Sequence, residues 1–91
     1  MKHAGSDALD TLEPFLRELR RREGLKERSR GVFYRGSRAF LHFHEHGTEF
    51  FADMRVHGEF ERFPATKAVD RRALLRRVDA LLTDGSDAGR R

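Results

Sequence analysis

The sequence predicts an α+β domain in which a helix is followed by an antiparallel meander of three or four strands and then by a second helix. Segments rich in leucine recur at helical spacing near both ends of the chain. Between them, β-prone runs alternate with short turns that contain glycine, which is typical of an antiparallel meander. A chain of 91 residues with 37% hydrophobic residues has one thin core, so we expect both helices to cover the same sheet face.

The first helix is expected over residues 12–23. Its apolar stripe repeats at steps of three and four residues and consists of Leu9, Leu12, Leu16 and Leu19. Proline is tolerated in the first turn of a helix, so Pro14 places the expected N-cap at Asp10 or Thr11. Gly24 is the expected stop signal.

The second helix is expected to follow Pro64. Its apolar residues share one helical face and are Leu74, Leu75, Val78, Leu81 and Leu82. Thr66 or Asp70 is the expected N-cap, and Gly85 is expected to end the helix.

The expected domain spans residues 11–84. Residues 1–10 lack apolar periodicity and residues 85–91 are polar, so both segments are expected to be disordered. No apolar run approaches the roughly 18 residues that a membrane span requires, and no apolar run follows Lys2 as it would in a secretory signal. These features predict a cytoplasmic protein without membrane contact.

The central part of the chain holds four β-prone runs, which are Val32–Tyr34, Arg38–Glu45, Glu49–Val56 and Phe60–Phe63. The charged segment Lys26–Arg30 is expected to be a connector. At His57–Gly58 we prefer a glycine bulge over a plain turn. A bulge would bury Phe60, whereas a plain turn would direct the neighbouring glutamates inward.

Cross-strand pairing of apolar residues predicts which sheet face packs on the helices. With His46–Gly47 at the hairpin tip, Phe43 faces Phe50 and Leu41 faces Ala52. A slip of one residue would place acidic side chains opposite these positions instead. The apolar side of this hairpin is therefore expected to lie beneath the helices, and the histidines that alternate with Leu41 and Phe43 are expected on the other face.

A second hairpin with its tip at Gly36–Ser37 sets Val32 opposite Leu41 on the apolar side. By this parity the other face carries a patch of aromatic and basic side chains, namely Phe33, Phe40, Phe51, Arg38 and Arg55. An apolar patch of this kind is typical of a partner or ligand surface. We therefore expect a binding or dimerisation module, with the patch paired between two copies of the chain by two-fold symmetry.

The same face offers a candidate metal site, which leads to an alternative function. Its members are His42, His44, Glu49 and Asp53. Imidazole and carboxylate groups suit zinc, iron, nickel or manganese. The chain has no cysteine, which excludes thiolate sites and disulfides. The alternative is thus a small metal-binding protein or an enzyme in which His42 or His44 acts as acid and base.

A third alternative is a basic nucleic-acid accessory protein. The formal net charge is +4, and the second helix carries four arginines that could contact phosphates, which are Arg71, Arg72, Arg76 and Arg77. Acidic residues are interleaved with the arginines and can pair with them. Nucleic-acid binding is therefore not the favoured reading.

Three runs along the strands carry a resemblance to other proteins. Phe33-Tyr34-Arg35, the run Phe40–Glu45 and the run Phe51–Arg55 are similar to those of short uncharacterised bacterial proteins. The resemblance covers Leu25–Leu82. It implies a shared fold and a bacterial origin, and it implies no activity.

Overall fold

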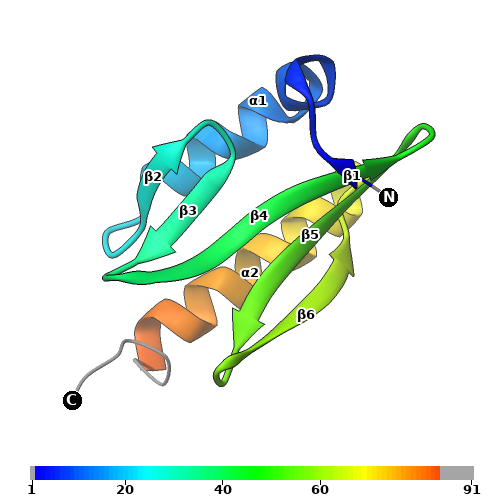
Figure 1. The fold of residues 1–91 in the computed structure, drawn as a ribbon. Helices are drawn as coiled ribbons and strands as arrows, with labels where there is room; N and C mark the ends of the chain where they lie inside the picture. Colours follow the sequence, from blue (N-terminus) through cyan, green and yellow to red (C-terminus); the bar gives the residue numbers. More distant parts are fainter. Residues whose placement is uncertain (1, 85–91) are drawn as a thin grey trace.

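The computed structural model describes residues 2–84 as two helices and a six-stranded antiparallel sheet (Figure 1). The elements in chain order are β1 (Lys2–His3), α1 (Ser6–Arg20), β2 (Lys26–Ser29), β3 (Val32–Arg35), β4 (Arg38–His46), β5 (Glu49–Val56), β6 (Glu59–Pro64) and α2 (Ala68–Asp84). The strands β2 to β6 form a meander in sequence order, and β1 pairs with β4 outside this path. The predicted α+β class is confirmed, but the sheet has more strands than expected.

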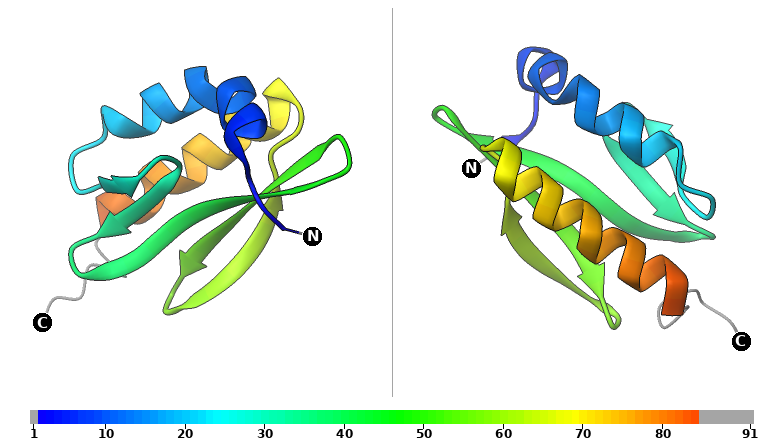
Figure 2. Two further views of the ribbon diagram at one scale, coloured as in Figure 1. Left: turned by 45° about the horizontal axis from the view of Figure 1, so that its top comes forward. Right: turned by 180° about the vertical axis from the view of Figure 1, so that it is seen from behind.

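Both helices pack on one face of the sheet (Figure 2). The core between them is apolar, and its fully buried members include Leu12, Leu16, Leu19, Phe33, Leu41, Ala52, Met54, Leu74 and Val78. Phe15 of α1 meets Phe43 of β4 edge to face, with ring centroids 6.0 Å apart. The other face of the sheet, which we call the open face, is not covered by either helix.

The N-terminal part of the domain differs from the prediction. Residues 2–10 are ordered, because β1 pairs with β4 and α1 begins at Ser6. Pro14 lies inside α1, where it removes one helical hydrogen bond. Arg30 supports the preceding turn by donating to the Leu9 carbonyl at 3.3 Å and to the Asp10 carboxylate at 2.8 Å. Packing of the leucine stripe outweighs the proline penalty.

The segment after α1 and the start of α2 also differ from the prediction. The expected connector at Lys26 forms β2, which pairs with β3. At the start of α2, Asp70 accepts a hydrogen bond from the Lys67 backbone N–H at 3.2 Å, as in a capping box. Thr66 instead uses its hydroxyl on the Phe50 backbone. Residues 85–91, with the expected helix end at Gly85, lie outside the described part.

The hairpin of β4 and β5 keeps its predicted faces but not its predicted register. His46 faces Glu49 across the turn, and Phe43 faces Ala52 rather than Phe50. The pairing is shifted by two residues. Because side-chain direction repeats every two residues, this shift leaves the side chains of the paired residues, from Leu41 to His46 and from Glu49 to Met54, on their expected faces.

A β-bulge at Phe40 reverses the predicted facing of β3. Tyr34 pairs with Ala39, but the next pair is Phe33 with Leu41, which leaves Phe40 as the extra residue of β4. Phe33 and Phe40 are therefore in the core, at 0% and 1% exposed. The prediction that both belong to a surface patch is wrong, because the parity argument assumed an unbroken ladder.

Arg35 is the one charged residue that is buried among residues 2–83. Its guanidinium donates to the Leu81 carbonyl at 2.9 Å and lies 5.8 Å from the centre of the Phe40 ring. It thereby ties β3 to the last turns of α2, where helix carbonyls favour a cation.

The turn between β5 and β6 is a plain two-residue turn, so the preferred bulge is absent. His57 and Gly58 both have positive φ, 52° and 94°, as a type I′ turn requires. Phe60 then lies on the open face and is 42% exposed. Glu61 faces the helix side but stays exposed, because β6 is the edge of the sheet.

Candidate metal centre

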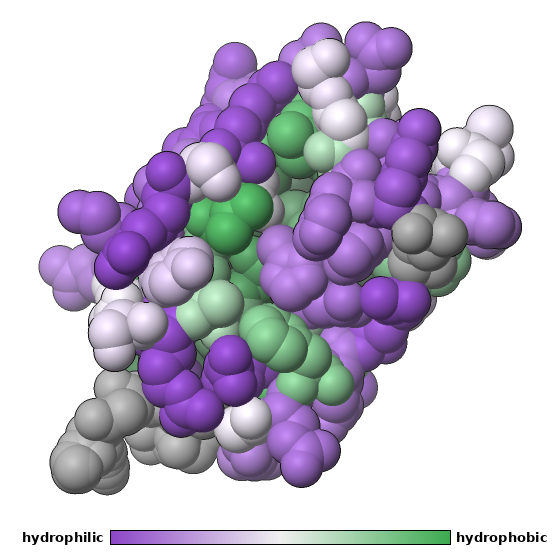
Figure 3. Space-filling view, viewed as in Figure 1, coloured by the Kyte–Doolittle hydropathy of each residue, from purple (hydrophilic) through white to green (hydrophobic). Residues whose placement is uncertain are grey.

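Three histidines and an aspartate meet at the centre of the open face, and we call them the histidine cluster: His3, His42, His44 and Asp53. They come from three strands, β1, β4 and β5. Strand pairing places His42 directly opposite Asp53 and His3 directly opposite His44. Seen from this face, hydrophilic side chains cover much of the surface and hydrophobic ones gather in separate patches (Figure 3).

The side chains of His42, His44 and Asp53 converge on one point. The Asp53 Oδ2 atom lies 3.0 Å from His44 Nε2 and 3.6 Å from His42 Nε2. One ligand atom from each of the three residues can be chosen so that all lie within 4.8 Å of one another. The Asp53 and His44 side chains are only 14% and 13% exposed, so the point is largely shielded from water.

The Nε2 atom of His44 is buried and has no hydrogen-bond partner within residues 2–84. The nearby Asp53 oxygen is close enough, but its direction from the ring does not satisfy hydrogen-bond geometry. A buried polar atom left without a partner costs about 1–3 kcal/mol. An additional ligand between the imidazole and the carboxylate would satisfy this nitrogen.

Arg62 of β6 holds the other side of the Asp53 carboxylate. It donates from Nε to Oδ1 at 2.8 Å and from Nη2 to Oδ2 at 2.9 Å. These hydrogen bonds, opposed by burial, lower the pKa of Asp53 below its usual value. Two parallel bonds occupy one lone pair on each oxygen, and a carboxylate has about four such sites. An ionised oxygen therefore remains available on the histidine side.

The surroundings of His42 favour the neutral form of its imidazole. Burial lowers its pKa, Asp53 opposes this effect, and the neighbouring histidines and Arg62 add to the lowering. A neutral ring offers the lone pair that a metal ion requires. Its ring also meets the Phe60 ring at 5.2 Å between centroids, so an aromatic wall flanks the centre.

Glu49, the fourth predicted ligand, is not part of the centre. It lies opposite His46 beside the exposed turn of the β4–β5 hairpin. The two-residue shift in register moved it away from His44, which faces Phe51 instead. The prediction that Glu49 is a ligand is therefore wrong, whereas His42, His44 and Asp53 are brought together.

The expected partner surface is smaller than the sequence implied. Phe51 is half-buried on the open face, and Arg38 is exposed. Arg55 is engaged within the chain, donating to the Ala39 carbonyl at 2.8 Å and to the Gly58 carbonyl at 3.0 Å. Only one of the three expected phenylalanines contributes. Phe60, which was expected in the core, is exposed on the same face, opposite Arg55.

The four arginines expected to bind nucleic acid do not act alike. Arg71 donates to the Ala65 and Thr66 carbonyls at the start of α2, and Arg77 lies over the Phe63 ring at 5.0 Å. Arg72 and Arg76 are exposed. Ion pairs with acidic side chains are formed by Arg20 at the end of α1, by Arg22 in the turn after it, and by Arg30 in the β2–β3 turn. Much of the positive charge is thus compensated locally.

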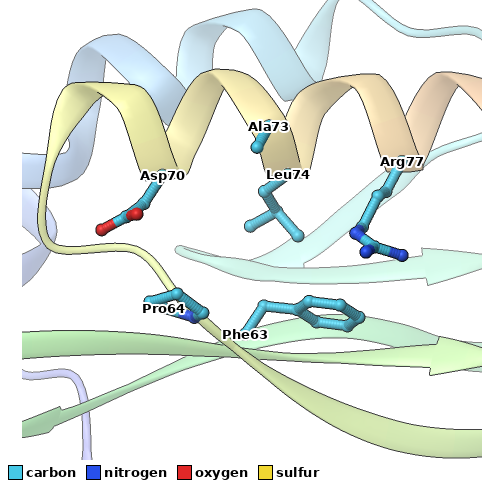
Figure 4. A pocket seen from close by; sticks show the side chains of 6 residues that line it. All are labelled: Phe63, Pro64, Asp70, Ala73, Leu74 and Arg77. Carbon is cyan, nitrogen blue, oxygen red and sulfur yellow. The ribbon is translucent and has the colours of Figure 1, made fainter.

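A hollow of about 210 Å³ lies between β6 and α2 (Figure 4). Its lining is largely apolar and includes two charged residues, Asp70 and Arg77. Asp70 caps α2 and Arg77 stacks on Phe63, so both already have partners within the chain. The hollow offers no converging reactive groups, unlike the histidine cluster.

His3 is the member of the cluster that sequence reasoning missed. It stands in a segment without apolar periodicity, which gives no sign that it pairs with β4. Its residue type was the only signal in the sequence. A site that begins with two histidines on one strand can include a further histidine from another part of the chain. The structure places its ring 4.7 Å from the His44 ring, nearly parallel, and 5.8 Å from the His42 ring.

No protein-family model matches this chain, and no curated protein or solved structure matches it either. The similarity to short bacterial proteins therefore stays a prediction. In the described part of the chain, neither helix is long and apolar enough to cross a membrane. The chemistry of the open face is what remains to indicate a function.

Proposed function

We propose that this protein binds a divalent transition-metal ion on its open sheet face through His42, His44 and Asp53. The observation that carries the proposal is the buried Nε2 atom of His44, which lacks a hydrogen-bond partner among the described residues and lies 3.0 Å from the Asp53 carboxylate. A metal ion between these groups would supply the missing contact.

The spacing of the groups fits a shared ion. Nitrogen and oxygen ligands lie about 2.0–2.2 Å from zinc. Two ligands of one ion are then about 3.0–3.5 Å apart at tetrahedral or octahedral angles. The 3.0 Å and 3.6 Å separations from Asp53 to the two imidazoles match this range closely. Small side-chain rotations would complete the centre.

The protonation states also support metal binding. A bound ion requires a neutral imidazole and an ionised carboxylate. The pKa of His42 is lowered mainly by burial, and the pKa of Asp53 is lowered mainly by Arg62. Two imidazoles and one carboxylate without thiolate favour zinc, iron, nickel, cobalt or manganese over copper(I).

This proposal replaces dimerisation as the best-supported function. A dimer of the expected kind requires a surface patch of three phenylalanines, and two of them, Phe33 and Phe40, are core residues. Three of the four expected metal ligands, in contrast, converge on one point. Homodimerisation and nucleic-acid binding remain predictions from the sequence.

The decisive experiment is a metal titration of untagged protein stripped with a chelator. Isothermal calorimetry with Zn²⁺ and absorption spectroscopy with Co²⁺ should show one ion per chain. The double variant His42→Ala/His44→Ala should bind at least about 100-fold more weakly, since it removes two ligands. The matched control is His46→Ala/His57→Ala, because both residues are exposed at turns.

The control variant should bind as tightly as the parent protein. Equal loss in the two double variants would show nonspecific coordination by surface histidines. That result, or failure of the parent protein to bind one ion per chain, would overturn the proposal.

A further inference from the structure

The structure places a third imidazole beside the proposed metal centre. From this we infer that His3 completes the ligand set, so that metal binding and docking of β1 on β4 stabilise each other. This inference rests on the proposed function. It concerns β1, the N-terminal strand. The three ligands on β4 and β5 form the centre of the proposed function without this strand.

His3 lies close to the proposed metal centre. His3 pairs with His44 across the β1–β4 ladder, and directly opposed residues have Cβ atoms about 4.5–5.5 Å apart on the same face. The His3 ring is 4.7 Å from the His44 ring and 5.8 Å from the His42 ring. An imidazole is therefore held within one side-chain rotation of the centre.

The exposed position of His3 leaves its side chain room to move. Its ring stacks on His44 with an interplanar angle of 27°. His3 is not among the three residues whose ligand atoms all lie within 4.8 Å of one another. A rotation of this exposed side chain is therefore needed to bring one of its nitrogens to the ion.

The strand β1 is attached to the sheet over a short length only. The strand has two residues, and the chain that follows is held by two further hydrogen bonds. Ala4 N–H donates to the Phe43 carbonyl at 3.0 Å, and Gly5 N–H donates to the Glu45 carboxylate at 2.7 Å. A two-residue terminal strand is marginal by itself. A bond from His3 to a metal ion would stabilise the pairing of β1 with β4.

A third protein nitrogen would also alter the character of the centre. Three nitrogens and one carboxylate oxygen fill the four positions of a tetrahedral ion, whereas two nitrogens and one oxygen leave a position open. The centre would then be closed when β1 is docked on β4 and open when it is not. The docking of this short strand would thus depend on the metal ion and would close the centre.

The test compares the parent protein with His3→Ala and with the control Lys2→Ala, an exposed neighbour on the same strand. Zn²⁺ affinity is measured by calorimetry, and hydrogen exchange of the Ala4 amide is followed by NMR with and without Zn²⁺. We expect His3→Ala to weaken affinity at least about tenfold and to abolish Zn²⁺-induced protection of the Ala4 amide. Lys2→Ala should preserve both.

The outcomes separate this inference from the proposed function. If the parent protein binds Zn²⁺ through His42, His44 and Asp53 but His3→Ala leaves its affinity unchanged, the inference fails and the proposed function stands. Ala4 protection that does not respond to Zn²⁺ in the parent protein overturns the inference in the same way. If the parent protein binds no ion, both fail together.

Discussion

Arg62 and Asp53 face each other across β5 and β6, and the guanidinium donates to both carboxylate oxygens at 2.8 Å and 2.9 Å. The fork fixes the plane of the carboxylate and turns one side of Oδ2 toward the histidines. Asp53 is thus oriented from the edge of the sheet, in the way that carboxylate ligands of metals are held by an outer hydrogen bond.

Substitution of Arg62 should raise the pKa of Asp53 in the metal-free protein. The hydrogen bonds from Arg62 are the largest cause of the lowered pKa, and Arg62→Gln removes the cation along with most of that effect. Carbon-13 NMR titration of the Asp53 carboxyl group should show the rise. Arg76→Gln, on exposed α2 surface, should leave the titration unchanged. An unaltered Asp53 titration in Arg62→Gln would show that the fork does not form in solution.

The elements that repeat regularly could be predicted from the sequence, and the irregular ones could not. Leucine spacing located both helices, and alternation along β4 and β5 placed His42 and His44 opposite the helix-covered face. The bulge at Phe40 has no such signature. One extra residue in one strand reverses the facing of its neighbour, so an argument from parity fails beyond it.

The bulge leads to a prediction about stability. Phe40→Ala should cost about 3–5 kcal/mol of unfolding free energy, because it empties a fully buried site. Phe60→Ala should cost about 1 kcal/mol or less, because Phe60 is 42% exposed at the sheet edge. Urea denaturation of the two variants beside the parent protein measures both values. If both substitutions lower the unfolding free energy by similarly small amounts, Phe40 lies at the surface and the bulge is contradicted.

The register of the β4–β5 hairpin shows a second limit of sequence reasoning. Phe43 finds an apolar partner in either register, Phe50 or Ala52, so side-chain pairing alone does not choose between them. The geometry of the turn selects the register. Gly47 has a φ of 61° and takes the first loop position, as in a type II′ turn. This choice removed Glu49 from the candidate site and set Asp53 opposite His42.

Acid should destabilise the domain partly through Glu13. Hydrogen bonds from Arg20 and Arg30 lower the pKa of Glu13 from 4.5 to about 2. A carboxyl group with a depressed pKa stabilises the fold fully above its unfolded pKa, and this contribution is lost as the pH falls toward the folded pKa. The loss should therefore develop between about pH 5 and pH 2.

The check is the free energy of unfolding as a function of pH for the parent protein and Glu13→Gln. The parent should be the more stable at neutral pH, and the difference should shrink across that acidic window. Glu23→Gln, at an exposed position beyond α1, serves as the control and should follow the parent curve. A pH-independent difference for Glu13→Gln would contradict an ionised, paired Glu13.

The packing of α1 against the β2–β3 turn can be tested at Gly31. Its φ is +80°, and a methyl group at this position would lie 2.7 Å from the Leu9 Cδ2 atom. Gly36 also has a positive φ, +62°, but nothing lies within 4 Å of the corresponding position. Alanine at either site bears the backbone cost of about 1–2 kcal/mol. Alanine at Gly31 must also displace the end of the Leu9 side chain, for at most about 1 kcal/mol more.

Thermal and urea denaturation of Gly31→Ala and Gly36→Ala should therefore rank Gly31→Ala as the less stable variant. The additional substitution Leu9→Ala should remove the difference, because it takes away the obstructing methyl group. If the two glycine variants are equally stable, Leu9 moves aside without loss. In that case the first turns of α1 do not rest firmly on the β2–β3 turn.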